Sequence, residues 1–342
     1  MDFSGLIGKY PINRLLTEQE RAHQLKQDRP LGLIPRYQLS VIKMNSTFLE
    51  TVDKWYGWKG AATAITSAVL LVISGVFGWM GLKLFLQGMG ILQSTLDADV
   101  ATANGIGMLF VFCLFGWGVL CLLRKESFAY THYPMRFNRK NRKVYFFRTN
   151  GTVLAYPWED LFFTLGTIPA SNLWEVRAHI LDADRKTVRE TFALSYSGTL
   201  EAAEFVGNTA NFFSEDFVRA HWEFVRRYME EGPQEILSQI QFCMPIDQKR
   251  ENVSLGFERI FANFAGAPAL LYFAMFPFCF VVSVFRIFAI QTSKIPFWPE
   301  EVEASCAIEP DDPYAIQGAA DGGRVAVYPE AALAAGVGFS TL

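Results

Sequence analysis

The sequence is poor in the residues from which catalytic and metal sites are usually built. It has four scattered histidines and five cysteines among 342 residues, and the cysteines form no CxxC pair. Three of them, Cys113, Cys121 and Cys279, lie in apolar stretches, which is typical of unpaired thiols in a reducing compartment. The signatures GxSxG and HExxH, the P-loop and the Rossmann fingerprint are all missing. We therefore expect no catalytic residues, no metal site and no cofactor.

Charge is also scarce. Charged residues make up 19% of the chain, below the ~25% of soluble domains, and the net charge is −3. This balance argues against nucleic acid as a partner. Residues 1–60 show neither the apolar core nor the cleavage site of a secretory signal, so we expect the first membrane helix to direct insertion.

Long apolar runs are plentiful instead. Three of them, roughly residues 61–82, 105–123 and 267–290, approach the ~20 residues that cross a bilayer as a helix. They predict an integral membrane protein whose soluble domain lies between the second and third runs. Pro268 and Pro277 interrupt the third run and Arg286 lies near its end, so a span, a re-entrant helix and an interfacial helix all fit it.

The distribution of basic residues orients the first two spans. The loop between them carries Asp97 and Asp99 but no Lys or Arg, whereas basic residues cluster after residue 123. Positive residues favour the cytoplasmic side, so the N-terminus and the main soluble domain are expected in the cytoplasm. We expect five divisions. They are an N-terminal cytoplasmic or interfacial segment (1–60), a transmembrane helix pair (61–123), a cytoplasmic sheet-plus-helix domain (124–265), a third membrane helix (266–292) and a tail (293–342) that is disordered from about residue 317.

Two predictions concern contacts at or in the membrane. Asn45–Lys59 has the aromatic and basic pattern of an amphipathic helix at the membrane surface. Gly75, Gly78 and Gly81 in the first span predict close helix packing, with the second span as partner or, alternatively, a second copy in a homo-oligomer.

The region 128–195 alternates as antiparallel strands do. Turns are expected at Asn138–Asn141, at Asn150–Gly151 and at Asp182–Lys186, giving six or seven strands. A helix capped by Ser214 follows, and we expect its face containing Trp222 to pack on the sheet. The order predicts an α+β domain, a bent sheet closed by one helix in a pleckstrin-homology-like arrangement.

Two polar clusters are candidate contact sites. The first is a basic cluster predicted to touch anionic lipid headgroups, at about 1 kcal/mol per residue; the alternative is a topology signal in a solvated turn. Its members are Arg136, Arg139, Lys140, Arg142 and Lys143. The second is a candidate partner contact, in which Trp298 anchors at the membrane surface and the acidic residues Glu300, Glu301 and Glu303 bind a basic partner. The alternative is that these acidic residues are simply solvated.

Four motifs carry a resemblance: RFNRKNRKVYFFR, YPWEDL, HWEFVRRYMEEGP and FWPEEVEASC. Together they resemble an uncharacterised family of proteobacterial membrane proteins often encoded in type VI secretion gene clusters, near spike proteins and toxic effectors. The resemblance covers roughly residues 127–314 and the preceding helix pair. It implies a non-enzymatic protein of the bacterial inner membrane, an immunity or accessory protein that binds a type VI secretion effector in the manner of a toxin–antitoxin pair. The alternatives are a lipid-headgroup-binding or regulatory membrane protein and, third, an enzyme acting on lipid.

Overall fold

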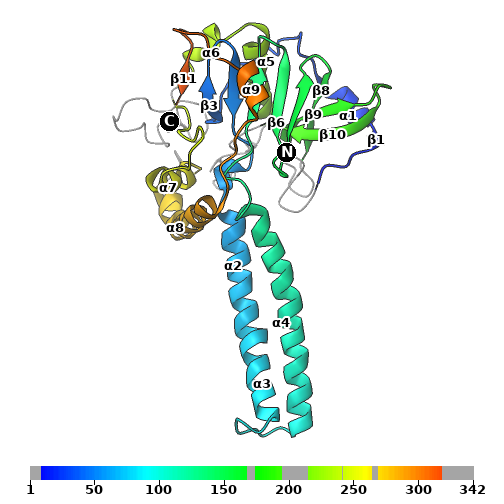
Figure 1. Cartoon of the computed structure of the whole chain (residues 1–342), viewed down its shortest axis with the longest axis vertical. Helices are drawn as coiled ribbons and strands as arrows, with labels where there is room; N and C mark the ends of the chain where they lie inside the picture. Colours follow the sequence, from blue (N-terminus) through cyan, green and yellow to red (C-terminus); the bar gives the residue numbers. More distant parts are fainter. Residues whose placement is uncertain (1–8, 168–173, 195–214, 241, 264–268, 318–342) are drawn as a thin grey trace.

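The computed structural model describes residues 9–167, 174–194, 215–240, 242–263 and 269–317. Two parts are evident in Figure 1: a mixed α+β body, here called the head, and a long pair of antiparallel helices, here called the hairpin, that leaves it on one side. The predicted α+β class is confirmed, with two antiparallel sheets in place of one.

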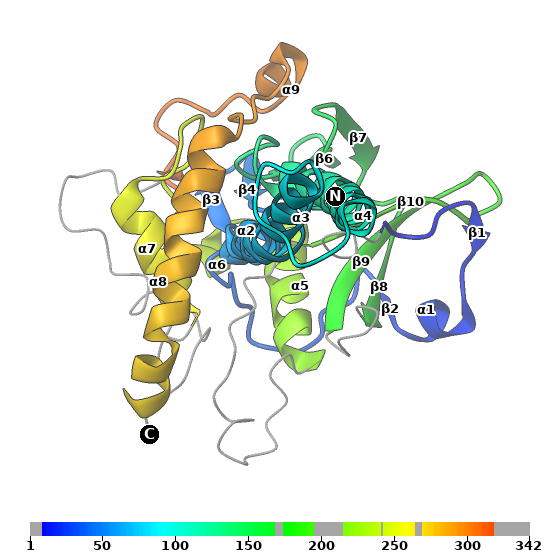
Figure 2. The same ribbon diagram turned by 90° about the horizontal axis from the view of Figure 1, so that it is seen from below.

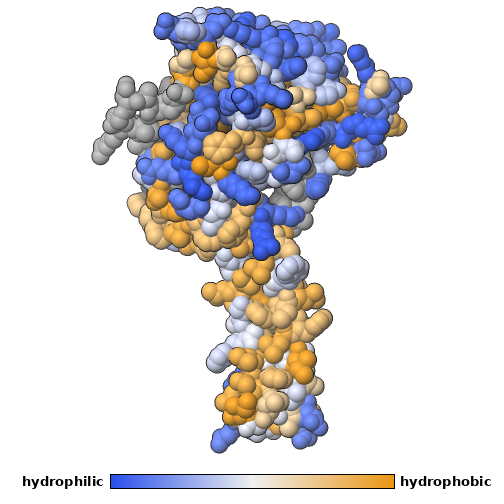
Figure 3. Space-filling model, viewed as in Figure 1, coloured by the Kyte–Doolittle hydropathy of each residue, from blue (hydrophilic) through white to orange (hydrophobic). Residues whose placement is uncertain are grey.

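The hairpin contains the two predicted apolar runs. Its first arm joins α2 (Ala61–Ile73), the π-helical segment η2 (Ser74–Trp79) and α3 (Met80–Gly88), and its second arm is α4 (Ala98–Glu126). Both arms, and α8 (Ala269–Thr292), are long and apolar enough to cross a membrane by length and composition. Large apolar side chains are exposed all along the hairpin (Figure 3), as expected of helices whose solvent is lipid.

The glycines of the first arm pack only in part as predicted. A Cβ on Gly81 would lie 3.0 Å from Met108, and one on Gly78 would lie 3.4 Å from Phe112, so both face α4, whereas Gly75 has no neighbour within 4 Å. Gly75 lies in the π-helical turn, which changes the rotation per residue, so it does not share the face of Gly78 and Gly81. A tighter approach was not predicted: a Cβ on Gly105 would lie 2.5 Å from the backbone nitrogen of Phe85.

All eleven described strands pair antiparallel with their neighbours. The first sheet has the order β11-β3-β4-β5-β6-β7 and the second the order β1-β10-β9-β8-β2. In chain order they are β1 (Arg14–Leu15), β2 (Gln24–Leu25), β3 (Val41–Met44), β4 (Phe48–Thr51), β5 (Met135–Asn138), β6 (Lys143–Phe147), β7 (Val153–Pro157), β8 (Leu161–Thr167), β9 (Trp174–Leu181), β10 (Thr187–Ala193) and β11 (Ile316–Gln317). The three predicted turns join β5 to β6, β6 to β7 and β9 to β10.

The hairpin is inserted between two neighbouring strands of the first sheet. Strand β4 precedes the hairpin, β5 follows it, and the two pair with Thr51 opposite Met135. The predicted amphipathic helix over Asn45–Lys59 is therefore wrong, because this segment is strand β4 followed by the short 3-10 turn η1 (Tyr56–Trp58). Phe48 and Leu49 are both buried on opposite faces of β4, and burial on both faces removes the alternation by which a strand is recognised.

Helix α5 (Glu215–Glu230) covers the sheets, as predicted. Trp222 is fully buried, with its ring centroid 5.6 Å from that of Trp158 and 4.4 Å from that of Phe163. The predicted cap, Ser214, lies outside the described residues. The shorter helices are α1 (Glu18–Ala22), α6 (Gln234–Leu237), α7 (Val253–Ala262) and α9 (Glu300–Ser305).

Helix α8 lies across the axis of the hairpin. Figure 2, seen along the hairpin, shows α8 lengthwise beneath the head, whereas Figure 1 shows it foreshortened. Helix α7 precedes it, and α9 and β11 follow it, all on the head. Strand β11 pairs with β3 through Ile316 and Met44. The predicted tail disorder concerns residues 318–342, which lie outside the described residues.

Candidate functional site

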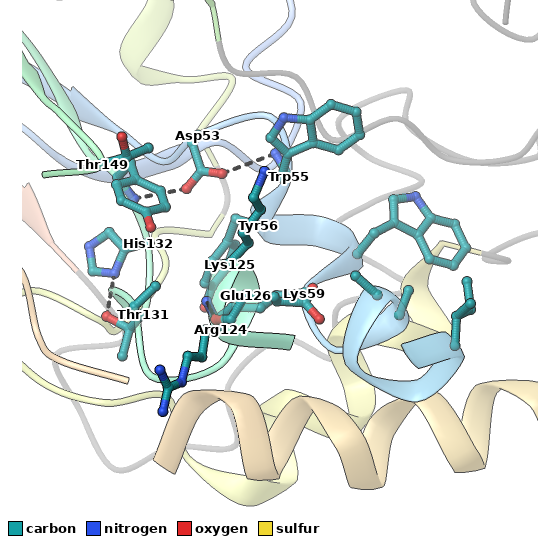
Figure 4. A pocket seen from close by; sticks show the side chains of 16 residues that line it. Asp53, Trp55, Tyr56, Lys59, Arg124, Lys125, Glu126, Thr131, His132 and Thr149 are labelled. Carbon is teal, nitrogen blue, oxygen red and sulfur yellow. Dashed lines mark hydrogen bonds between the residues drawn. The ribbon is translucent and has the colours of Figure 1, made fainter. Parts of the chain in front are cut away.

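A cavity of about 440 Å³ lies where the hairpin joins the head (Figure 4). Its wall is built by the segment between β4 and α2, by the first turns of α2 and by the segment between α4 and β5. The apolar part of the wall includes Trp55, Trp58 and Ile65, and the polar part includes Asp53, Lys59 and His132. The cavity thus exists because two adjacent strands continue into the two arms of the hairpin at this point.

The polar groups of the wall are held by hydrogen bonds to neighbouring backbone and hydroxyl groups. The Asp53 carboxylate accepts from the backbone nitrogens of Tyr133 at 2.8 Å and Trp55 at 3.1 Å, while burial raises its pKa. Nδ1 of His132 lies 3.0 Å from the Thr131 hydroxyl, and burial lowers the pKa of His132 to about 3. The imidazole is therefore neutral near neutral pH.

Lys59 and Glu126 tie the two arms of the hairpin together at the cavity. The Lys59 ammonium donates to the backbone oxygens of Tyr130 at 2.8 Å and Glu126 at 3.1 Å, and burial lowers its pKa to about 8. The Glu126 carboxylate, at the end of α4, accepts from the backbone nitrogens of Gly60 at 2.8 Å and Thr63 at 2.6 Å. The last residue of one arm thus caps the first turn of the other, where α2 has no side-chain cap of its own.

Behind this cap, a buried ion pair fixes α8 to the junction. Arg286 is fully buried and donates to both carboxylate oxygens of Glu251, at 2.7 and 2.9 Å. The same guanidinium donates to the backbone oxygen of Tyr56 at 2.8 Å, and the Tyr56 hydroxyl donates to Glu251 at 2.7 Å. A Cβ on Gly60 would lie 2.4 Å from the backbone nitrogen of Arg286, so only glycine allows this approach. Arg286 inside an apolar run was the one sequence signal of this network.

The chemistry of the cavity suits an amphiphile. Its apolar side adjoins the start of α2. The exposed Arg124 and Lys125, at the end of α4, also line the cavity and form its rim. The close-up in Figure 4 shows Arg124 and the Asp53–His132 wall on different sides of the cavity. Among the described residues, no group of three or more His, Cys, Asp or Glu side chains is placed to hold a metal ion.

The basic cluster of the β5–β6 turn lies elsewhere. Arg136 is fully buried, pairs with Glu50 at 2.8 Å and Glu303 at 2.9 Å, and stacks on the rings of Phe48 and Trp298. The predicted lipid contact is wrong for Arg136, because a fully buried guanidinium offers a headgroup no surface.

The other four basic residues follow β5 away from the hairpin. Arg142 pairs with Glu230 at 2.8 Å and Lys140 pairs with Glu309. Glu230 ends α5 next to α6, which Figure 1 places at the end of the head opposite the hairpin. Arg139 approaches Gly232 in the same region, and Lys143 is exposed at the start of β6. This position does not favour the predicted lipid contact.

The second candidate cluster splits into a buried and an exposed half. Trp298 is buried and donates to Glu50 at 3.0 Å, and Glu303 pairs with Arg136, so their partners lie within the chain. The predicted membrane anchor at Trp298 is wrong, because the indole belongs to an internal cluster with Phe48 and Phe147. Glu300 and Glu301 remain exposed on α9, and their role as a partner contact stays a prediction.

Comparison with known proteins gives one assignment. No curated protein and no solved structure matches the chain. The model of a family described as a family of unknown function, DUF6708, matches residues 112–310. Since this match covers more than half of the chain, the protein belongs to the DUF6708 family.

Proposed function

We propose that this is a non-enzymatic inner-membrane protein that acts by binding, and that the junction cavity holds the headgroup of an anionic phospholipid. The observation that carries the proposal is the composition of the cavity: apolar side chains adjoin the hairpin, and Arg124 and Lys125 stand on the rim. In the topology expected from the basic residues, the head is cytoplasmic and the cavity lies at the headgroup layer of the inner leaflet.

The size of the cavity supports this ligand class. Pockets for small molecules usually measure ~300–1,000 Å³ and combine apolar walls with few polar groups, and this one measures about 440 Å³. Trp55 and Trp58 suit the membrane–water boundary, where an indole has one apolar and one hydrated side. The neutral His132 and the backbone-bound Asp53 serve as walls rather than as an acid and a base.

The expected contribution of the two rim cations is modest. Each basic residue near an anionic surface contributes about 1 kcal/mol, so Arg124 and Lys125 together should change affinity by roughly 30-fold. This contribution weakens as salt screens the charges.

The test uses the full chain in detergent micelles with a fluorescent phosphatidylglycerol as probe. The double variant Arg124→Gln/Lys125→Gln should bind the probe roughly 30-fold more weakly. The matched control is Arg185→Gln/Lys186→Gln, two exposed cations at the β9–β10 turn, which should bind as the parent does. Equal weakening in both variants, or no saturable binding by the parent, would refute the proposal.

The cellular role rests on the sequence resemblance alone. We extend the proposal to an immunity or accessory protein for a type VI secretion effector, bound through the membrane helices or the head. If the gene beside this one encodes a toxin, co-expression of this protein should rescue cells that the toxin kills. Failure of rescue would remove the immunity role and leave the lipid proposal to its own test.

A further inference from the structure

We infer that α8 does not cross the membrane but lies flat in it, with its apolar face inserted into the leaflet that faces the head. The protein then has two spans, and the chain after α8 returns to the side of the head. The partner of this surface is the acyl layer of one leaflet. The inference does not depend on a ligand in the junction cavity.

The first argument counts the crossings of the membrane. Strands β4 and β5 belong to one sheet, so the chain between them crosses an even number of times, as the two arms of the hairpin do. Strand β11 pairs with β3 in that same sheet, to which β7 also belongs, so the chain from β7 to β11 must also cross an even number of times. Within the described part of this interval, α8 is the one candidate span. A single crossing there would separate β11 from its partner strand.

The second argument is the direction of α8. It lies across the hairpin axis under the head (Figure 2), so it cannot be parallel to the bilayer normal while the hairpin is. The underside of the head is apolar where α8 lies (Figure 3), and this surface faces the side from which the hairpin leaves. One position of the bilayer then accommodates both apolar elements, with the hairpin crossing it and α8 lying along its surface.

The third argument is the division of α8 into two faces. One face is buried against the head, with Cys279, Val282 and Arg286 almost or fully inaccessible. The opposite face carries Phe273, Phe280 and Val284, which are 73%, 49% and 46% exposed. Residues at three- and four-residue intervals share one side of a helix, so this exposed stripe is continuous. An interfacial helix buries such a stripe ~5–10 Å deep in the headgroup–acyl boundary.

The Arg286–Glu251 pair explains why α8 stays in this position. Moving α8 into a crossing orientation would extract a guanidinium that now makes two bonds to Glu251 and one to the Tyr56 carbonyl. It would also expose that charge to hydrocarbon, where ionised side chains are strongly disfavoured. The head therefore supplies the polar environment that water supplies to an ordinary interfacial helix.

The test measures depth in the membrane at two positions of α8. Leu270→Cys and Val284→Cys, made singly in a chain without the exposed Cys113 and Cys121, are labelled with an environment-sensitive fluorophore in vesicles. Quenching by brominated lipids confined to one leaflet of asymmetric vesicles then reports the depth of each label from that leaflet, so that two positions equally far from the midplane in opposite leaflets are distinguished. Fourteen residues of helix rise about 21 Å, so a span would place the two labels at clearly different depths. We expect equal depths.

The matched control is Ile106→Cys and Leu120→Cys in α4, which have the same spacing and exposed apolar side chains. These labels should differ in depth by about 21 Å, which proves that the method resolves a crossing. A difference of that size in α8 would overturn the inference.

A second readout fixes the side of the chain beyond α8. Glu300→Cys in α9 should react with an impermeant thiol reagent in the same preparation, intact cells or inverted vesicles, as Asn141→Cys in the β5–β6 turn. Ser94→Cys, in the loop between the arms, should react in the opposite one. If Glu300→Cys reacts together with Ser94→Cys, α8 crosses the membrane and the inference is wrong.

Discussion

The buried ion pair at the junction offers the sharpest test of how α8 is held. Glu251→Gln keeps the size of the side chain but removes its charge, so Arg286 stays buried with only neutral acceptors. The guanidinium is fully buried and the carboxylate nearly so. Removing one partner of a buried pair typically costs 3–5 kcal/mol, because the remaining charge is left uncompensated.

The assay is thermal unfolding of the full chain in nanodiscs, followed by intrinsic tryptophan fluorescence. A loss of about 4 kcal/mol should lower Tm by roughly 10 °C. The double variant Glu251→Met/Arg286→Met should lose less stability than the sum of the losses of Glu251→Met and Arg286→Met, because it leaves no unpaired charge. The control is Asp182→Asn, which breaks the exposed pair with Arg189 and should cost at most ~1 kcal/mol. A Glu251→Gln shift no larger than that of the control would refute the reasoning.

Three further predictions use the same assay. Trp222→Ala should cost about 3–5 kcal/mol, because the indole is fully buried against Trp158. A loss under ~1 kcal/mol would contradict this. The measurement needs the full chain, since strands from both sides of the hairpin form the head. The pKa of His132 is about 3 in the folded protein and ~6.5 in an unfolded chain, so its contribution to stability is complete above pH 6.5 and is lost as the pH falls towards 3. His132→Gln should therefore make Tm decline less steeply between pH 6.5 and 3. An unchanged slope would contradict the assignment. Gly105→Ala should push the arms apart and lower Tm, because its Cβ would lie 2.5 Å from Phe85. The control Gly118→Ala has no neighbour within 4 Å and should leave Tm unchanged. Equal effects of the two variants would mean that the arms pack differently.

Local patterns predicted much of the head correctly. The turns at Asn138–Asn141, Asn150–Gly151 and Asp182–Lys186 were recognised because each needs particular residues, such as Gly151 with φ +85°. The packing of α5 followed from its 3.6-residue periodicity. These features depend on neighbours in the sequence, and therefore the sequence is sufficient to predict them.

Pairings between distant segments could not be predicted in this way. Nothing local indicates that β4 pairs with β5 across the whole hairpin, or that β11 returns to β3. The basic cluster was misread for the same reason. Arg136 looks like one cation among several, and only the fold brings Glu50 and Glu303 to it.

The candidate site was missed because its components look unremarkable singly. Asp53, Lys59 and His132 lie in connecting segments, and each becomes buried only where the strands meet the arms of the hairpin. The character of α8 was ambiguous for a different reason. Apart from Arg286 and Ser283, the residues on both its exposed and its head-facing side are mostly apolar, so its sequence shows little amphipathic contrast even though the two faces have different neighbours.

Insertion of the hairpin between adjacent strands has a mechanical consequence for the cavity. The arms begin and end within a few residues of β4 and β5, and Lys59 and Glu126 connect them through direct hydrogen bonds. A tilt of one arm must therefore displace the cap on the other arm, or else displace the strands to which both are joined. The strands are held by the core of the head, and Arg286 binds α8 to the same junction through Glu251 and the Tyr56 carbonyl. Lys59 and Glu126 also line the cavity, so a change in hairpin tilt changes the geometry of its wall. A lipid bound in the cavity would consequently favour one tilt over another, and the thickness of the membrane would in turn alter the affinity for that lipid.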